Sequence, residues 1–223
     1  NVPVLQKQMI YKCRAKGKPV IVATQMLESM RDNIIPTRAE VSDVANAVMD
    51  GTDAVMLSAE TSTGRYPVQV VKEMVKIAKN AESVMQTSPI IGHTDATLET
   101  DEICKQVYDL TLSLNLKGIV VVSKTGKTVA SLSRHRLSIP IWEIATSLER
   151  IRQDSLFRGV KGYYISELPE DRDECTQKTI ETIYSYGELD LNDKIAIISG
   201  SSIRHKTSNT ILEIVTVKDV LTR

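Results

Sequence analysis

Hydroxyl and carboxyl side chains follow two apolar runs near the start of the chain. The run "PVIVAT" (19–24) ends at Thr24, and the run "DAVML" (53–57) is followed directly by Ser58 and then by Glu60. Polar groups at the C-terminal ends of parallel strands are typical of a barrel active site, where they can orient a substrate or transfer a proton. The same residues also fit a structural role, in which Thr24 caps a helix and the other two form a turn.

A loop with phosphate-binding chemistry follows a later strand, "GIVVVS" (118–123). Its sequence, "SKTGKT", combines hydroxyl groups, cationic side chains and one glycine, which together can cradle a phosphate against backbone N–H groups. The residues of this candidate site are Ser123, Lys124, Thr125, Gly126, Lys127 and Thr128. The spacing is not that of a Walker loop, so an ordinary solvated turn is the alternative.

A second polar loop, "SGSSIRHKTSNT" (199–210), also emerges from the end of a predicted strand. It supplies Arg204 and Lys206, with His205 between them and several hydroxyl groups on either side. Cations and hydroxyls are the groups that bind phosphate oxygens. The presence of this second loop therefore favours a phosphate site over a plain turn at residues 123–128.

The composition restricts the class of protein. The 223 residues include 28 Lys and Arg against 28 Asp and Glu, and a net charge of zero gives no support for binding to nucleic acid or to a membrane surface. Cys13, Cys104 and Cys175 lie far apart and the three histidines are scattered, so neither a disulfide frame nor a metal site is predicted. No apolar run approaches the roughly 20 residues that span a bilayer. We expect a soluble, cytoplasmic protein.

Apolar periodicity predicts an α/β fold in two parts. Residues 1–85 follow the order helix, strand, helix, strand, helix, which is the repeat of a parallel α/β fold. Pro, Gly, Thr and Asp in 87–100 predict a linker, which gives domains of residues 1–87 and 88–223. The second domain is predicted to be an open α/β domain with a mostly parallel sheet of about five strands. Because the chain opens at Asn1 almost directly into a helix, we expect a fragment of a longer protein.

Long strings at fixed spacing resemble pyruvate kinase. The matching strings in the first domain are "GKPVIVATQMLESM" (17–30), "PTRAEVSDVANAVMDGTDAVMLSAET" (36–61) and "YPVQVVKEM" (66–74). The second domain resembles the C-terminal domain of this family through "SKTGKT", "ASLSRHR", "IPIWEIAT" and the tail "TSNTILEIVTV". The resemblance implies that the first domain is the last quarter of a TIM-type (β/α)8 barrel. It also implies that the parent enzyme transfers a phosphoryl group from phosphoenolpyruvate to ADP, giving pyruvate and ATP.

The resemblance also implies roles for the polar residues at the barrel strand ends. Thr24 would lie beside the enolate that phosphoryl transfer leaves behind, and Ser58 and Glu60 would belong to a network that supplies its proton. The chain departs from the family pattern at Ala59, where glycine is usual, and near Thr63, where a lysine is often found. These departures concern the local geometry and the nucleotide contacts.

Further implications concern cofactors and assembly. The parent would be a glycolytic homotetramer that uses magnesium and potassium, and the ligands of both ions would lie upstream of this chain. This chain would then hold no metal and would be inactive alone. Arg38 would lie near a subunit interface, although a solvated arginine in the first turn of a helix fits equally well. The loops at 123–128 and 199–210 would enclose an allosteric site for a phosphorylated effector.

Two alternatives belong to other classes of protein. The chain could be a stand-alone module that binds phosphorylated metabolites without catalysis, or a structural oligomerisation domain whose loops bind nothing. For the first domain, a quarter of a barrel would expose the apolar faces of its strands and helices. We therefore expect aggregation or partial disorder of residues 1–85.

Overall fold

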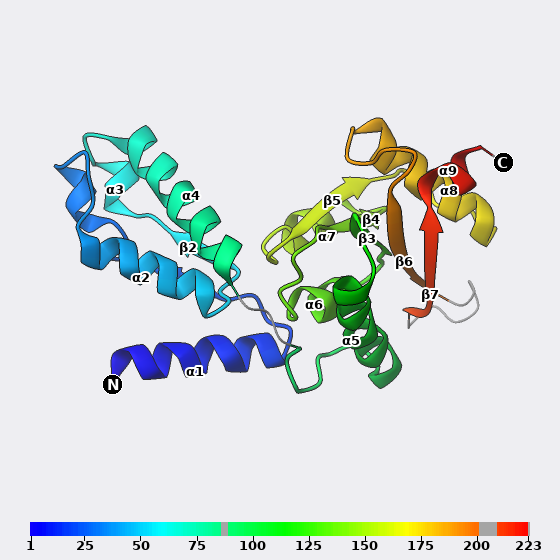
Figure 1. Ribbon diagram of the computed structural model, residues 1–223, viewed down its shortest axis with the longest axis horizontal. Helices are drawn as coiled ribbons and strands as arrows, with labels where there is room; N and C mark the ends of the chain where they lie inside the picture. The colour runs from blue at the N-terminus through cyan, green and yellow to red at the C-terminus, as the bar shows by residue number, and fades with distance from the viewer. Residues whose placement is uncertain (86–88, 201–208, 223) are drawn as a thin grey trace. The chain divides into compact units, whose positions relative to one another are not determined.

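The computed structural model describes residues 1–85, 89–200 and 209–222 (Figure 1). The chain divides into two compact units. Unit 1 consists of Asn1–Arg14 and Lys18–Gln86, and unit 2 consists of Ala15–Gly17 and Thr87–Arg223.

Unit 1 is built around two parallel strands. These are β1 (Ile21–Ala23) and β2 (Ala54–Met56), which pair with Ala23 opposite Met56. The helices are α1 (Val2–Ala15), α2 (Arg38–Met49), α3 (Ala59–Ser62) and α4 (Pro67–Val84), and a 3-10 turn, η1 (Glu28–Arg31), follows β1. The order helix, strand, helix, strand, helix agrees with the sequence prediction, whereas the short segments η1 and α3 were not predicted.

Helix α2 begins at a capping box. The Thr37 side chain accepts a hydrogen bond from the Glu40 backbone N–H, and the Glu40 carboxylate accepts one from the Thr37 backbone N–H. Glu40 also accepts hydrogen bonds from the backbone N–H and the hydroxyl of Ser29, at 2.7 and 2.6 Å. Burial by itself would raise the pKa of Glu40, but these hydrogen bonds outweigh it and lower that pKa. The start of α2 is thereby fixed to the segment that follows β1.

Unit 1 has a buried core and also exposes apolar side chains. Val22 of β1 is buried in this core, whereas Ile21 on the opposite face of the strand is 48% exposed and Met56 of β2 is 42% exposed. Helix α4 carries two apolar stripes. One is buried (Val70, Met74, Ile77 and Ala81) and the other is exposed (Val68, Val71 and Val75). These exposed residues agree with the expectation that this segment presents apolar faces of strands and helices.

Unit 2 is a five-stranded sheet in the order β5-β4-β3-β6-β7. Among the described strands, β3 to β6 are parallel and β7 is antiparallel to its neighbour β6. The strands are β3 (Gly118–Val122), β4 (Ile141–Ala145), β5 (Val160–Tyr164), β6 (Lys194–Gly200) and β7 (Asn209–Thr216). The helices are α5 (Leu98–Ser113), α6 (Lys127–Ser133), α7 (Leu148–Asp154), α8 (Arg172–Ser185) and α9 (Val217–Leu221). The predicted mostly parallel sheet is confirmed, and α9 is an additional element.

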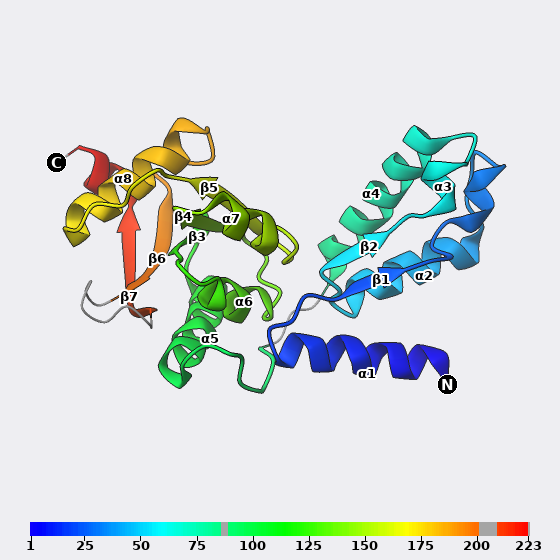
Figure 2. The same ribbon diagram turned by 180° about the vertical axis from the view of Figure 1, so that it is seen from behind.

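Two apolar cores lie on opposite faces of this sheet (Figure 2). One joins the sheet to α5 and α6 through residues such as Val107 and Leu132, and the other joins it to α8 and α9 through Ile180, Ile183 and Val217. Along the chain, the strands proceed from β3 outward to β5, and β6 then returns to the other side of β3. The direction of winding therefore reverses between β3 and β6, and in open α/β sheets ligands bind at the strand ends at such a reversal.

Candidate functional site

Thr24 lies immediately after β1 in an unusual backbone conformation. Thr24 and Gln25 have φ angles of 71° and 54°, so two consecutive non-glycine residues occupy the left-handed region. This conformation is costly for a β-branched residue and is found mostly at functional sites, where surrounding structure enforces it. The side chain of Thr24 is exposed. A helix-capping role is not needed to explain it, because the next helical segment, η1, begins at Glu28.

Glu60 joins the segments that follow the two strands of unit 1. Its side chain is fully buried, and Oε2 accepts a hydrogen bond from the Ser58 backbone N–H at 2.7 Å while Oε1 accepts one from the Leu27 backbone N–H at 3.4 Å. Because Ala23 lies opposite Met56, Thr24 and Ser58 emerge at the same end of the strand pair. The structure therefore brings the three predicted catalytic residues to one edge, where the Glu60 carboxylate joins the backbone of the two segments.

The other residues singled out in unit 1 lie close in sequence to this edge. Ala59 is the first residue of α3, and Thr63 follows the last residue of α3 and donates its hydroxyl to the Ala59 carbonyl at 3.2 Å. Both departures from the family pattern therefore fall within or next to the short helix that contains Glu60. Arg38 is the first residue of α2, and its side chain is exposed.

In unit 2, the loop at 123–128 lies where the direction of winding reverses. It follows β3, and the segment that contains Arg204 and Lys206 follows the adjacent parallel strand β6. Val121 lies opposite Ile198, so both strands end at the same edge of the sheet. Arg204, His205 and Lys206 lie outside the described residues.

The six residues of this loop fall into two groups by exposure. Lys124, Thr125 and Lys127 are exposed, whereas Ser123, Gly126 and Thr128 are buried. The Ser123 hydroxyl accepts a hydrogen bond from the Gly126 backbone N–H at 2.9 Å, so that N–H is not free to bind a phosphate as the sequence suggested. Gly126 has a φ of 74°, which a residue with a side chain adopts only with strain.

The two lysines of the loop have different neighbours. Lys124 is close enough to Cys175 of α8 to influence its thiol. Burial raises the pKa of Cys175, while a hydrogen bond from Thr179 and the Lys124 charge partly oppose the rise. Lys127 instead lines a small cavity with Lys16 and Arg150. The two exposed lysines of the loop therefore have different surroundings: Lys124 lies near α8, and Lys127 lines the small cavity.

Sequence reasoning missed two buried carboxyl groups beneath this loop. Glu143 of β4 is 0% exposed and Asp154 at the end of α7 is 1% exposed. Burial, followed by the adjacent Asp154 carboxylate, raises the pKa of Glu143 to about 8, although Arg150 and Ser123 partly oppose the rise. The available signal was the single charged residue in the otherwise apolar strand "IWEIA".

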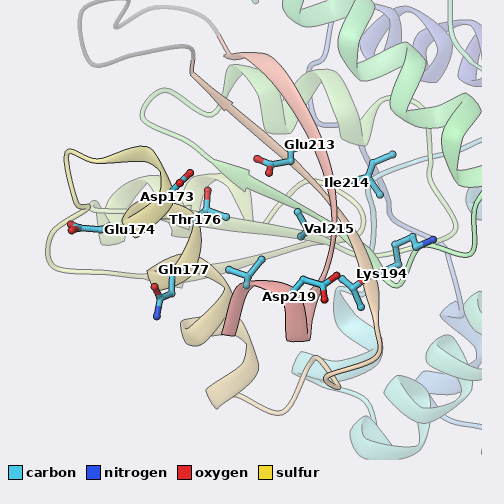
Figure 3. Close-up of a pocket in the computed structure, with 11 residues that line it drawn as sticks. Asp173, Glu174, Thr176, Gln177, Lys194, Glu213, Ile214, Val215 and Asp219 are labelled. Atoms are coloured by element: carbon cyan, nitrogen blue, oxygen red, sulfur yellow. The ribbon is translucent and has the colours of Figure 1, made fainter. Parts of the chain in front are cut away.

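A larger cavity of about 520 Å³ lies elsewhere in unit 2, between α8, β7 and α9 (Figure 3). Its charged lining residues are Asp173, Glu174, Lys194, Glu213 and Asp219. Four carboxylates against one lysine do not suit a phosphorylated ligand.

The described residues contain neither a metal-binding cluster nor a membrane-spanning helix. Residues 1–85, 89–200 and 209–222 contain no group of three or more His, Cys, Asp or Glu side chains placed to hold a metal ion. Within that part of the chain, no helix is both long and apolar enough to cross a membrane. Cys104 is fully buried, and burial raises the pKa of its thiol to about 12, which makes it unreactive at neutral pH.

Family models match both parts of the chain. Residues 1–71 match the family described as "Pyruvate kinase, barrel domain". Residues 101–215, which are more than half of the chain, match the family described as "Pyruvate kinase, alpha/beta domain".

Known relatives support the same assignment. The chain is 37% identical to a pyruvate kinase of Geobacillus stearothermophilus over 228 residues, which covers 100% of this chain and 38% of that protein. It is 37% identical to a pyruvate kinase of Borreliella burgdorferi, with 99% of this chain and 47% of that protein covered. The crystal structure of a pyruvate kinase from Cryptosporidium parvum matches 96% of this chain and 43% of its own, at 31% identity and a TM-score of 0.84. The chain therefore spans less than half the length of these relatives. It belongs to the pyruvate kinase family and corresponds to the end of the barrel together with the C-terminal α/β domain.

Proposed function

We propose that this chain completes the active site of a pyruvate kinase, which transfers a phosphoryl group from phosphoenolpyruvate to ADP in glycolysis. In this proposal, residues 1–87 are the end of the catalytic barrel and residues 88–223 are a regulatory domain. The observation that carries it is the edge formed by Thr24, Ser58 and Glu60, with its strained backbone at the C-terminal ends of parallel strands.

The chemistry assigned to these residues is proton supply. Phosphoryl transfer leaves an enolate, which becomes pyruvate when its terminal carbon is protonated. The exposed Thr24 hydroxyl is the group placed to donate or relay this proton. Glu60 holds the Ser58 and Leu27 backbone in position from beneath, which keeps the edge rigid.

Magnesium and potassium would supply charge neutralisation when bound in the parent enzyme. The described residues offer no cluster for either ion. Following the family resemblance, we place the ligands of both ions in other segments of the parent, and we propose that this chain is inactive alone. The ATP-binding, homotetrameric and cytoplasmic character of the parent, and an interface role for Arg38, belong to the same proposal.

The catalytic part is tested in an enzyme that contains this chain together with the preceding barrel residues. Thr24→Val is expected to lower kcat by about 10²–10⁴-fold, the usual range for loss of a general acid, and Thr24→Ser is expected to restore most of it. Thr182→Val, at a threonine of α8 in the other unit, is the matched control. Incorporation of solvent deuterium into pyruvate reports the proton transfer directly. If Thr24→Val retained normal turnover and normal deuterium incorporation, the assigned role would be wrong.

For the regulatory domain, we propose that the loops at 123–128 and 199–210 bind a phosphorylated small-molecule effector. The reversal of winding between β3 and β6 supports this assignment. Calorimetric titration with fructose bisphosphates, AMP and a simple sugar phosphate tests it, with Lys124→Ala and Lys206→Ala as variants. Saturable binding that both variants weaken is expected, and no binding by the unaltered chain would count against the site.

Unit 2 has its own sheet and two cores, so a stand-alone module that binds phosphorylated metabolites is the second candidate function. Binding by residues 88–223 produced alone would support such autonomy. Rescue of pyruvate kinase activity when this chain is combined with the preceding barrel residues would instead favour the enzyme.

A further inference from the structure

A small cavity lies beside the loop at 123–128, within unit 2. Its volume is about 120 Å³, which is below the roughly 300–1,000 Å³ of pockets that enclose whole small-molecule ligands. A cavity of this size suits a single phosphate group or an inorganic anion of similar shape. Its lining residues with polar side chains are Lys16, Thr94, Asp95, Thr125, Lys127, Arg150 and Asp154.

The charges around this cavity favour an anion. Three of the lining side chains are cationic (Lys16, Lys127 and Arg150) and two are acidic (Asp95 and Asp154), which leaves one net positive charge. Arg150 is held in place, because one of its terminal nitrogens donates to the Thr125 carbonyl at 3.2 Å and the other lies 3.0 Å from Asp154 Oδ1. A guanidinium that is fixed in this way loses little entropy when it binds an oxyanion.

Asp154 lines the cavity, and the buried carboxyl group of Glu143 lies next to it, behind the lining. Glu143 lies opposite Gly162 in the sheet, and a Cβ at Gly162 would lie 2.5 Å from a methyl group of Ile151 in α7. The missing side chain thus allows α7 to approach the sheet, which brings Asp154 to Glu143. On the other side, a Cβ at Gly126 would lie only 2.5 Å from Asp154 Oδ2, so the loop rests directly on this carboxylate.

Three oxygens of the pair have no hydrogen-bond donor. Glu143 Oε1, Glu143 Oε2 and Asp154 Oδ2 are buried and unpartnered among the described residues. Two adjacent buried carboxylates cannot both remain ionised without a large cost. A proton bound between them is the donor that the pair lacks, and the raised pKa of Glu143 agrees with this arrangement.

Few charged or polar groups face the pair from the surrounding elements. Among the described residues, the groups that act on Glu143 besides Asp154 are Arg150 of α7 and Ser123 at the end of β3. When Glu143 is protonated, the cavity retains its one net positive charge. When Glu143 is ionised, its negative charge behind the lining cancels that excess. The protonation state of Glu143 therefore decides whether the cavity attracts an anion.

We propose that the cavity lined by Lys16, Lys127 and Arg150 binds a phosphate-sized anion, and that the Glu143–Asp154 pair takes up a proton when it does. The cavity shares Thr125, Gly126 and Lys127 with the proposed effector loop, so the inference rests in part on that proposal. This inference differs from the proposed effector site in two ways: the anion contacts Lys16 and Arg150, and its binding becomes weaker as the pH rises.

Calorimetric titration with two inorganic anions tests the proposal. Sulfate is the main probe because it remains a dianion throughout the neutral range, so any proton taken up must go to the protein. Inorganic phosphate is the companion probe. Titrations at about pH 8 in buffers of different ionisation enthalpy give the number of protons bound with the anion. We expect uptake of a fraction of one proton, approaching one at higher pH, and an affinity that falls by up to about tenfold per pH unit above about pH 8.

Variants at Glu143 and Lys16 separate the contribution of the buried carboxyl pair from that of the cations that line the cavity. Glu143→Gln keeps the shape and cannot ionise, so it is expected to bind sulfate without proton uptake and with nearly constant affinity from about pH 7 to 9. Lys16→Ala is expected to weaken binding, whereas Glu213→Gln, at an exposed carboxylate of β7, is the matched control. Proton uptake by the unaltered chain is informative even if Glu143→Gln fails to fold.

Three results would overturn the proposal. They are no sulfate binding, sulfate binding without proton uptake, and sulfate binding that Lys16→Ala leaves intact. Loss of binding in Lys124→Ala but not in Lys16→Ala would place the anion on the effector loop, so the proposed function would survive while this inference failed.

Discussion

Replacing Glu143 by Gln is expected to make the folding stability of unit 2 much less dependent on pH. In the folded chain the pKa of Glu143 is raised to about 8 from the ordinary 4.5, so the folded state holds a proton that the unfolded state has lost between these values. The free energy of unfolding therefore falls as the pH rises through this window, and the stabilisation by the bound proton is lost above about pH 8. Glutamine has no proton to lose, so the variant should not show this fall.

The size of the effect follows from the raised pKa. A rise from 4.5 to about 8, at about 1.4 kcal/mol per pH unit, corresponds to about 5 kcal/mol at most. At about pH 5 the two proteins should have similar stability, because protonated glutamate and glutamine have nearly the same shape. At about pH 8.5 the variant should be more stable by up to this amount.

Other groups with shifted pKa values affect the folding stability outside the pH range in which Glu143 does. Hydrogen bonds lower the pKa of Asp101 despite its burial, and a hydrogen bond from Lys161 lowers that of Glu188. Their stabilising effects are complete above the ordinary pKa of each carboxyl and are lost only in acid. The pKa of Lys161 is raised, so its contribution is lost only at strongly alkaline pH.

Urea unfolding followed by tryptophan fluorescence provides the assay. Trp142 is the only tryptophan in the sequence, it is 1% exposed, and it precedes Glu143 in β4, so its emission reports on unit 2. Glu213→Gln controls for the loss of one carboxylate elsewhere in the same unit. A stability difference between Glu143→Gln and the unaltered chain that stayed constant from about pH 5 to 8.5 would refute the proton-sharing interpretation.

Three further substitutions test the local geometry. Gly126→Ala is expected to cost about 2–4 kcal/mol of unit 2 stability in the same assay, because strain at a φ of 74° adds to the clash with Asp154; Gly187→Ala, also at 74° but with open space around it, should cost only about 1 kcal/mol. Glu60→Ala should destabilise unit 1 by about 2–4 kcal/mol and speed hydrogen exchange of the two backbone N–H groups that it leaves unpaired, and normal exchange would contradict its positioning role. Thr24→Gly should stabilise unit 1 by about 1 kcal/mol, measured by hydrogen exchange of its backbone N–H groups, since glycine relieves the strained φ of 71°; a loss of stability would show that the side chain makes a compensating contact.

Much of the fold could be predicted because the apolar pattern is strong. Buried parallel strands such as "GIVVV" are continuous apolar runs, and the helices between them carry apolar residues at helical spacing. The elements that escaped prediction, η1, α3 and α9, span only four or five residues each. Segments of that length contain too few residues to show a helical period, so tertiary contacts decide their conformation.

For the candidate active site, the sequence predicted which residues come together but not how Glu60 is buried and hydrogen-bonded. Thr24, Ser58 and Glu60 stand at strand ends, and a parallel pair brings such positions to one edge without further information. The sequence did not show that Glu60 would be fully buried and bonded to the backbone of two segments. Its position two residues after Ser58 predicts proximity to that residue, whereas the contact with Leu27 depends on the path of the chain after β1.

The carboxyl pair beneath the loop at 123–128 could not be predicted, because none of the residues that create it is informative by itself. A glutamate within an apolar strand needs a buried partner, but the sequence offers many carboxyl and cationic groups at similar distances along the chain. Asp154 becomes that partner only because Gly162 lets α7 approach the sheet and Gly126 lets the loop rest on it. A family match fixes the fold and the position of the loop, yet the electrostatics of the cavity depend on a contact between a strand and a helix. The response of this domain to pH therefore has to be derived from the packing of α7, and another member of the family with the same loop but without this pair should bind anions independently of pH in the neutral range.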